Sequence, residues 1–333
     1  MATLGATALT LNDYRKRQNP QGYIDEIIEV LSQSNPILDD MTWMEGNLTT
    51  GNKTTQRNAL PIPSVRYINR GVAPGKSSTK QIVDTTTILE ARSRVDIELL
   101  ALAPDKEAFR RSEDVAHIEA FGQKVANMVI YGNTELDPDT FNGLDIRHRL
   151  FGVTDSAAQG YTTVNMGGTG SALTSAYFVD WGERTATGIY PRGATAGLTH
   201  KDLGQRTVQD GNGLPFEAME SLFNWKVGLT VRDYRAVGAL RNVDPTVLTT
   251  GTAANKLTFL QNFLTVHDRM RHPERCVLYT GSALYTALKV FLMDKNNSYV
   301  TRETLENGIS VLKFDGVKVV KLDAISNAEA EIS

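Results

Sequence analysis

Few residues of this 333-residue chain have both the type and the spacing that a reactive or ligand-binding site requires. The stretch GVAPGKSS at 71–78 contains the glycines and the lysine of a phosphate-binding loop, but it is one residue short of the required spacing. It also lies at the tip of an expected hairpin, without the helix N-terminus that holds a phosphate. We therefore predict an exposed turn at these residues.

A second stretch, DPDTFNG at 137–143, shares part of the pattern of a calcium-binding loop. Phe141 stands at the third ligand position, and the glycine comes one position late. His148 occupies the place of the bidentate glutamate. These departures favour a structured turn over a calcium site.

The remaining candidates for chemistry are the five histidines and the single cysteine, Cys276. The histidines follow neither H-E-x-x-H nor zinc-ligand spacing. Cys276 begins an expected buried strand, which favours a core position over a nucleophile. Neither a G-x-S-x-G elbow nor a dinucleotide-binding fingerprint occurs in the chain. We expect no catalytic residue, no metal site and no cofactor.

Composition and charge are typical of a soluble globular protein and do not favour direct binding of nucleic acid. The net charge is -3, whereas direct nucleic-acid binders usually carry a strong basic excess. One cysteine excludes an internal disulfide framework and suits a reducing compartment. No apolar run approaches the roughly 20 residues that span a bilayer. The basic residues near the N-terminus follow the apolar stretch, which is not typical of a secretion signal. We expect synthesis in the cytosol.

The longest element that the sequence predicts is a β-hairpin. TTTILEARSRVDIELL at 85–100 alternates apolar and polar residues with the period of a strand. The outgoing limb, 53–69, carries Pro61 and Pro63, which suit an edge strand. An isolated two-stranded ribbon is marginal in water, so we expect this hairpin to pack on a second copy of the chain. The expected intersubunit contacts, with at least two of the charged residues paired across the interface, are Leu89, Glu90, Arg92, Arg94, Val95, Asp96, Ile97 and Glu98.

Helical periodicity predicts a short amphipathic helix near 20–34 and one continuous helix over 105–131. The long helix would present one face to a sheet that includes part of 223–244. A glycine inside a helix costs about 1 kcal/mol relative to alanine, so its presence at Gly122 suggests a close approach of the neighbouring backbone. The expected packing face consists of Val115, Ile118, Gly122, Val125 and Val129.

The second half of the chain mixes strands and helices. AYFVDW and TGIYPRG are the clearest short strands, and 223–244 is a second long β-prone stretch. The last third reads as helix 256–270, strand CVLYT, helix 281–293 and a hairpin around Asp315-Gly316. These patterns predict an α+β chain.

The order of arm, long hairpin and long helix resembles the major capsid proteins of tailed bacteriophages with the Hong Kong 97-type fold, in particular those of short-tailed phages (podoviruses). The stretches that carry the resemblance are EIIEVLSQSNPILDDMTWMEGN, YGNTELDPDTFNGLDIR, YFVDWGERTATGIYPRGATAGL and NWKVGLTVRDYRAVGALRNVD. The resemblance implies an icosahedral shell of hexamers and pentamers enclosing double-stranded DNA. It implies weak contact with that DNA, no membrane, and a portal, a scaffold and a cement protein as further partners.

The resemblance also implies a domain organisation, in which the elements of the Hong Kong 97-type fold follow one another along the chain in a rearranged order. The expected segments are an N-terminal arm at 1–45, an extension loop at 46–103, a peripheral domain with its spine helix at 104–145, a mixed β region at 146–222, a long peripheral strand at 223–245 and an axial domain at 246–333. The chain would reside in the virion capsid, and in the host cytoplasm before assembly. Two alternatives stay open, a nanocompartment shell of the same fold and a soluble enzyme with a dimerisation arm.

Overall fold

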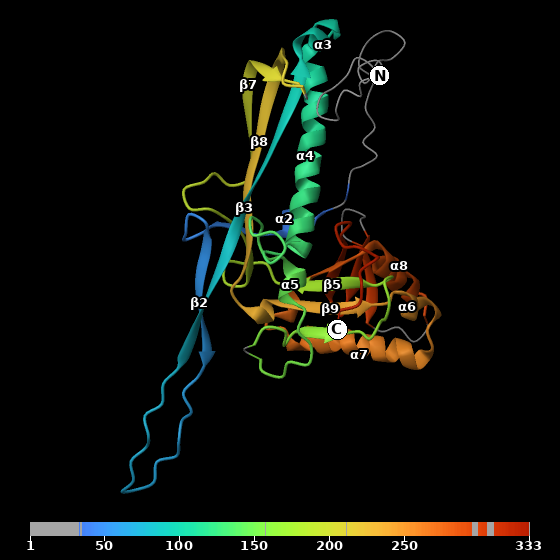
Figure 1. Cartoon of the computed structure of the whole chain (residues 1–333). Coiled ribbons are helices and arrows are strands. Elements are labelled where there is room, and N and C mark those ends of the chain that lie inside the picture. The colour runs from blue at the N-terminus through green and yellow to red at the C-terminus, as the bar shows by residue number, and fades with distance from the viewer. Residues whose placement is uncertain are drawn as a thin grey trace. The chain divides into compact units, whose positions relative to one another are not determined.

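The computed structural model describes residue 33 and residues 35–332, apart from 157, 211, 295–298 and 305–309. The helix expected at 20–34 and most of the expected N-terminal arm lie outside the described residues. The chain divides into a smaller unit, Ile88–Val125 with Thr195–Val227, and a larger unit, Ser34–Thr87 with Ala126–Ala194 and Gly228–Ser333. Figure 1 shows the elements of both, and β3, α4 and β8 contribute residues to each.

One sheet has the strand order β1-β6-β8-β3-β2, with β7 paired to β8. Its strands are β1 (Trp43–Glu45), β2 (Gly51–Ala59), β3 (Ser78–Asp96), β6 (Ala186–Tyr190), β7 (Leu198–Gln209) and β8 (Pro215–Val231). The antiparallel pairing of β2 with β3 confirms the predicted hairpin, and β6 confirms the short strand read from TGIYPRG. The outgoing limb is a strand only as far as Ala59, so the edge strand expected over 53–69 is wrong beyond that residue, where Pro61 and Pro63 lack the backbone donor of a strand.

The returning limb of the hairpin ends earlier than the sequence suggests. The prediction of a strand up to residue 100 is wrong, because β3 ends at Asp96 and helix α3 (Ile97–Leu102) follows at once. The Asp96 carboxylate accepts a hydrogen bond from the backbone N–H of Glu98 at 2.8 Å, and this capping bond starts the helix. Leu99 and Leu100 therefore enter the core of the smaller unit together with Val95, Ala103 and Phe109.

The long helix is confirmed as α4 (Lys106–Tyr131), but its expected packing face is partly wrong. Val125 and Val129 are fully buried, whereas Val115 and Ile118 remain 50% and 49% exposed. A Cβ added at Gly122 would meet no atom within 4 Å, so no backbone approaches closely there.

The inward-facing stripe in the smaller unit lies roughly a third of a turn away, on the side of the helix that carries the buried Phe109 and Phe121 and the half-buried His117. The His117 and Phe121 rings pack on the Phe223 ring of β8, with centroid distances of 5.6 and 6.5 Å. The helix therefore does contact the strand segment that the sequence indicated, but through aromatic residues rather than through the aliphatic face.

The larger unit contains a seven-stranded sheet in the order β11-β12-β13-β10-β5-β9-β4. Its strands are β4 (Thr163–Asn165), β5 (Thr174–Val179), β9 (Val237–Val243), β10 (Val277–Thr280), β11 (Val300–Thr304), β12 (Ser310–Phe314) and β13 (Val317–Lys321). The helices α6 (Thr246–Thr250), α7 (Ala253–Arg269) and α8 (Ser282–Phe291) share its core. Asp315 and Gly316 both have positive φ, 46° and 82°, as the predicted tight hairpin turn requires.

The prediction of a single long strand over 223–244 is wrong. β8 ends at Val231, and the Asp233 side chain caps a short 3-10 helix, η1 (Tyr234–Ala236), by accepting from the backbone N–H of Arg235. β9 then begins at Val237 and belongs to the other sheet. Three short elements complete the described chain, namely α2 (Ile37–Asp40), α5 (Leu144–Arg147) and η2 (Pro273–Arg275).

Candidate assembly surfaces

The tip of the β2–β3 hairpin exposes apolar side chains without a core of its own. Residues 60–77 continue beyond the paired strands as a strand-free loop, which Figure 1 shows in blue. Ile62 is 86% exposed and Ile68 is 93% exposed, and Leu60, Val65, Tyr67 and Val72 are exposed as well. Exposed apolar groups gathered in one segment mark a surface that another molecule covers. The predicted exposed turn at 71–78 is confirmed, apart from Ser78, which begins β3.

The part of the hairpin between residues 46 and 83 carries charge of one sign only. Residues 46–83 contain six basic residues and no acidic residue, whereas the whole chain has a net charge of -3. The six are Lys53, Arg57, Arg66, Arg70, Lys76 and Lys80. The rest of the chain therefore carries -9, since -3 minus +6 is -9. A cationic hairpin on an acidic protein is electrostatically complementary to a second copy of that protein.

The charges on β3 find partners inside the chain. Arg94 Nε lies 2.9 Å from Glu220 Oε1, and Arg92 Nη1 lies 3.6 Å from the same oxygen. Arg92 also reaches Glu90 at 3.3 Å. Glu220 is buried, so these contacts neutralise a carboxylate that would otherwise be costly.

Among the expected intersubunit contacts on β3 and α3, Val95 is corrected. Arg92 and Arg94 pair with their own Glu220, and Val95 is buried in its own core at 1% exposure. Asp96 uses its carboxylate to cap α3. Seven of the expected residues keep partly or fully exposed side chains and stay predictions as contacts, namely Leu89, Glu90, Arg92, Arg94, Asp96, Ile97 and Glu98.

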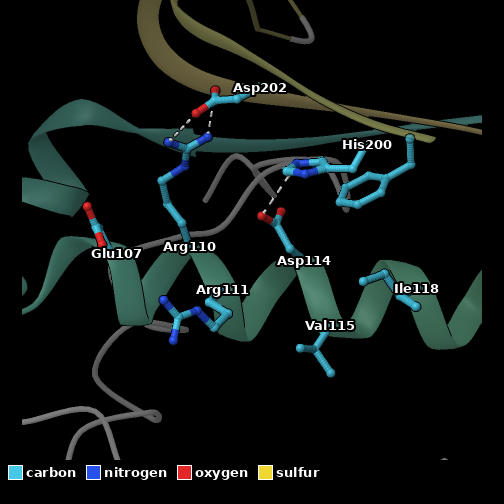
Figure 2. Close-up of a pocket in the computed structure, with 9 residues that line it drawn as sticks. Glu107, Arg110, Arg111, Asp114, Val115, Ile118, His200 and Asp202 are labelled. Atoms are coloured by element: carbon cyan, nitrogen blue, oxygen red, sulfur yellow. Dashed lines mark hydrogen bonds and ion pairs between the residues drawn. The ribbon is translucent and has the colours of Figure 1, made fainter. Parts of the chain in front are cut away.

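A cavity of about 420 Å³ lies between α4 and the β7–β8 pair in the smaller unit. Figure 2 shows Arg110 and Asp114 reaching from the helix toward Asp202 and His200 of β7. Arg110 donates two hydrogen bonds to Asp202, at 3.1 and 2.9 Å. These hydrogen bonds raise the pKa of Arg110 and lower the pKa of Asp202.

Beside the Arg110–Asp202 pair, an aromatic contact also lines the cavity between α4 and the β7–β8 pair. His200 Nε2 lies 3.9 Å from Asp114, and the His200 ring stacks on Phe223 at 4.8 Å. Arg110 and Asp202 therefore neutralise each other inside the cavity. The arrangement fastens the helix to the strands. The sequence gives no local signal for it, because these residues are far apart in the chain.

The larger unit encloses a buried polar centre around Arg241, which is 1% exposed. The Arg241 guanidinium donates to the carboxylate of Asp145, to the hydroxyl of Tyr177 and to Ser175 Oγ. Burial raises the pKa of Tyr177, so its hydroxyl stays protonated. Asp84, Arg147 and Thr230 form a second buried group, in which Arg147 Nη2 lies 2.7 Å from Asp84 Oδ1. An arginine inside the apolar run VGALRNV was the one signal in the sequence for such a centre.

The described residues contain no group of three or more His, Cys, Asp or Glu side chains that could hold a metal ion. Burial raises the pKa of the Cys276 thiol to about 12, and the side chain belongs to the core as predicted. The turn predicted at 137–143 is also confirmed. No helix in the described part of the chain is long and apolar enough to cross a membrane.

Solved structures with the same fold are phage capsids. Over 100% of this chain and 99% of the other, the structure resembles that of bacteriophage epsilon15, with 30% sequence identity and a TM-score of 0.74. It also resembles the bacteriophage JBD30 capsid over 91% of this chain and 95% of that one, with 12% identity and a TM-score of 0.51. No curated protein matches the chain.

The fold and the exposed hairpin define a capsid subunit of the Hong Kong 97 type. The family model described as major capsid protein GP7 matches residues 19–333, and the chain belongs to this family. It is a structural, shell-forming capsid protein of a tailed phage, and it assembles with itself into an icosahedral shell in the virion. The expected fold class and family are confirmed.

Proposed function

We propose that the chain forms the hexamers and pentamers of a shell around double-stranded DNA, and that the tip of its hairpin links neighbouring copies. The observation that supports this most directly is the strand-free loop 60–77 with its six exposed apolar side chains. Fully burying one such side chain contributes about 1.5–3 kcal/mol, so a partner that covers the loop gains a large stabilisation.

The expected domain roles stay proposals, with one adjustment. Residues 1–45 act as the arm, 46–103 as the extension loop, and 104–145 as the peripheral domain with its spine helix. The assignment of the mixed β region, 146–222, is not altered. β9 shares a sheet with β10 and β13 rather than with β8, which favours placing 237–245 with the axial domain at 246–333.

The further partners are proposed from the resemblance alone. The packaged DNA contacts the inner wall weakly and without sequence specificity, which suits a protein of net charge -3. Assembly takes place in the host cytoplasm with a portal, a scaffold and a cement protein. Nuclease-protected DNA inside purified particles distinguishes this shell from a nanocompartment, which would enclose a protein cargo.

A pair of loop variants tests the linking role. Ile62→Asp with Ile68→Asp places charges where we expect apolar contact, and Ser64→Ala with Ser77→Ala is a control in the same loop. We expect the aspartate variant to remain folded, because neither isoleucine belongs to a core, and to form no closed particles in negative-stain images. The control should form shells. Normal particles from the aspartate variant would contradict the proposal.

A further inference from the structure

Where the paired strands of the hairpin meet the loop 60–77, they contain a basic groove with no counter-charge from the described residues of the chain. A cavity of about 310 Å³ in the larger unit is lined by Gln56, Arg57 and Asn58 of β2, Lys80 of β3, and Leu150, Ala158, Gln159 and Tyr234. Neither Arg57 nor Lys80 forms an ion pair with any other described residue. Leu150, beside these cations, is 57% exposed. The groove therefore offers two free cations next to an apolar patch.

The opposite surface occurs elsewhere on the same unit. The turn that follows α4 exposes the carboxylates of Glu135, Asp137 and Asp139, and Leu136 between them is 84% exposed. None of the three carboxylates forms an ion pair within the described chain. The turn thus combines negative charge with a protruding leucine, as the groove combines positive charge with an apolar wall.

Hydrogen bonds hold this acidic turn in one conformation. Asn133 Oδ1 accepts from the backbone N–H of Glu135 at 2.8 Å, and Asn142 Oδ1 accepts from the backbone N–H of Thr134 at 3.0 Å. A turn that is already ordered loses little conformational entropy when it docks.

The turn does not fill the groove of its own chain. Thr85 and Thr87 of β3 donate to the carbonyl oxygens of Thr140 and Asp139, at 3.2 and 2.7 Å. These bonds anchor the turn five and seven residues along the strand from Lys80, which is roughly 17–23 Å at about 3.3 Å per residue. Two complementary surfaces held apart on one chain can meet only between copies.

We propose that the acidic turn 135–139 of one copy docks in the basic groove of a second copy. Glu135 and Asp139 would pair with Arg57 and Lys80, while Leu136 covers Leu150. Because the two surfaces differ, the contact is heterologous, and such contacts close into rings when the rotation permits. The inference deepens the proposed shell assembly and rests on it, but it assigns a contact separate from the hairpin tip.

Charge reversal tests the pairing. One variant carries Arg57→Glu with Lys80→Glu, a second carries Glu135→Lys with Asp139→Lys, and a third carries all four changes. Asp137 is left intact because its side chain accepts from the backbone N–H of Asp139. Lys201→Glu with Lys318→Glu changes the net charge as much as the first variant does and is the control. Thermal melting of each purified subunit verifies that the variants fold.

We expect each two-site reversal to raise the protein concentration needed for particle formation by about tenfold, equal to about 1.4 kcal/mol. The four-site variant should return to the wild-type concentration, because every interface then carries the same pairs with their signs exchanged. The control should leave it unchanged. Reversals without effect, or a four-site variant no better than the two-site ones, would overturn the proposal.

A cross-linking measurement decides the matter even if a reversed variant fails to fold. Leu136→Cys with Leu150→Cys places thiols on the two surfaces, while Cys276 stays buried. Under mild oxidation we expect disulfide-linked dimers and larger ladders on a non-reducing gel, and each single variant should form no ladder. A monomer with an internal disulfide, or no cross-link, contradicts the contact. If the wild-type chain formed no shells yet the ladder appeared, the proposed shell assembly would fail and this contact would stand.

Discussion

In the larger unit, a buried arginine and a half-exposed arginine bind the same carboxylate, and we expect their removal to change the free energy of unfolding by different amounts. Arg241 and Asp145 are both buried, and each depends on the other for its charge to be tolerated. Arg149 binds the same Asp145 carboxylate at 2.6 Å from a half-exposed position. The two arginines therefore contribute to one carboxylate under different dielectric conditions.

Asp145→Ala should lower the free energy of unfolding by about 3–5 kcal/mol, because it leaves Arg241 charged and buried without its nearest carboxylate. Arg149→Ala, the matched control on the same carboxylate, should lower it by only about 0–1 kcal/mol. Urea denaturation of the soluble subunit measures both values. Equal losses would show that Arg241 does not depend on Asp145.

His148 predicts how stability responds to acid. Burial, and after it the nearby cations Arg241 and Arg147, lower the pKa of its imidazole to about 3. The Nδ1 atom lies 2.9 Å from Thr163 Oγ1. The folded protein therefore keeps His148 neutral, while the unfolded chain takes up a proton near pH 6.5.

Because the folded pKa lies below the unfolded one, this contribution to stability is complete above pH 6.5 and is lost as the pH falls toward 3. The slope from His148 should reach about 1.4 kcal/mol per pH unit. His148→Asn should flatten it, and His272→Gln, at a partly exposed position, should not. Urea midpoints between pH 4 and 7, a window that follows from these pKa values, test this. An unchanged slope in the His148 variant would contradict the assignment.

At the scale of the element, helix α4 separates what periodicity predicts from what it does not. The sequence indicated one long helix and the strand region it contacts, and both are confirmed. Its expected face was wrong at Val115, Ile118 and Gly122, because the two aliphatic residues outweighed the aromatic stripe. His117 is polar by type, and only its stacking on Phe223, which is distant in sequence, marks it as an inward residue.

Gly122→Ala should raise the free energy of unfolding by about 1 kcal/mol, since the added Cβ meets no atom and the helix gains propensity. Gly132→Ala is the matched control, because its Cβ would collide with the carbonyl oxygens of Phe141 and Met128. Urea denaturation of the two subunits measures both changes. A destabilised Gly122→Ala protein would show that this helix face is covered within the subunit.

The two β errors have a common physical origin. β-propensity at 223–244 is continuous, but the strand order assigns β8 and β9 to different sheets, and sheet membership depends on partners far along the chain. Likewise Asp96 ends a strand whose alternation continues through Leu99, because a capping hydrogen bond outweighs the pattern. Local patterns identified these elements and could not locate their ends.

For the whole molecule, the family was predictable from long stretches of sequence, whereas the assembly surfaces required three dimensions. The groove at Arg57 and Lys80 joins residues from three regions of the chain, and the acidic turn looks like any solvated loop in the sequence. The one-signed charge of the hairpin is visible in the sequence, but its meaning depends on knowing that the loop has no core.

Association of subunits should slow as salt is added. The positive hairpin attracts the negative remainder of a second copy, and this attraction is screened as the Debye length falls from about 30 Å at 0.01 M to about 3 Å at 1 M salt. Light scattering of assembling subunits measures the rate. A variant with Arg66→Gln and Arg70→Gln carries fewer positive charges on the hairpin. Its rate of association should therefore depend less strongly on salt. A rate that does not change with salt would contradict an electrostatic approach.

The same hairpin also governs which encounters fail. Two copies that meet through residues 46–83 bring six positive charges against six, with no acidic residue in either segment to offset them. We expect such an encounter to separate before the exposed isoleucines adhere. Repulsion of this kind would keep free subunits dispersed and would let a misplaced copy leave a growing shell.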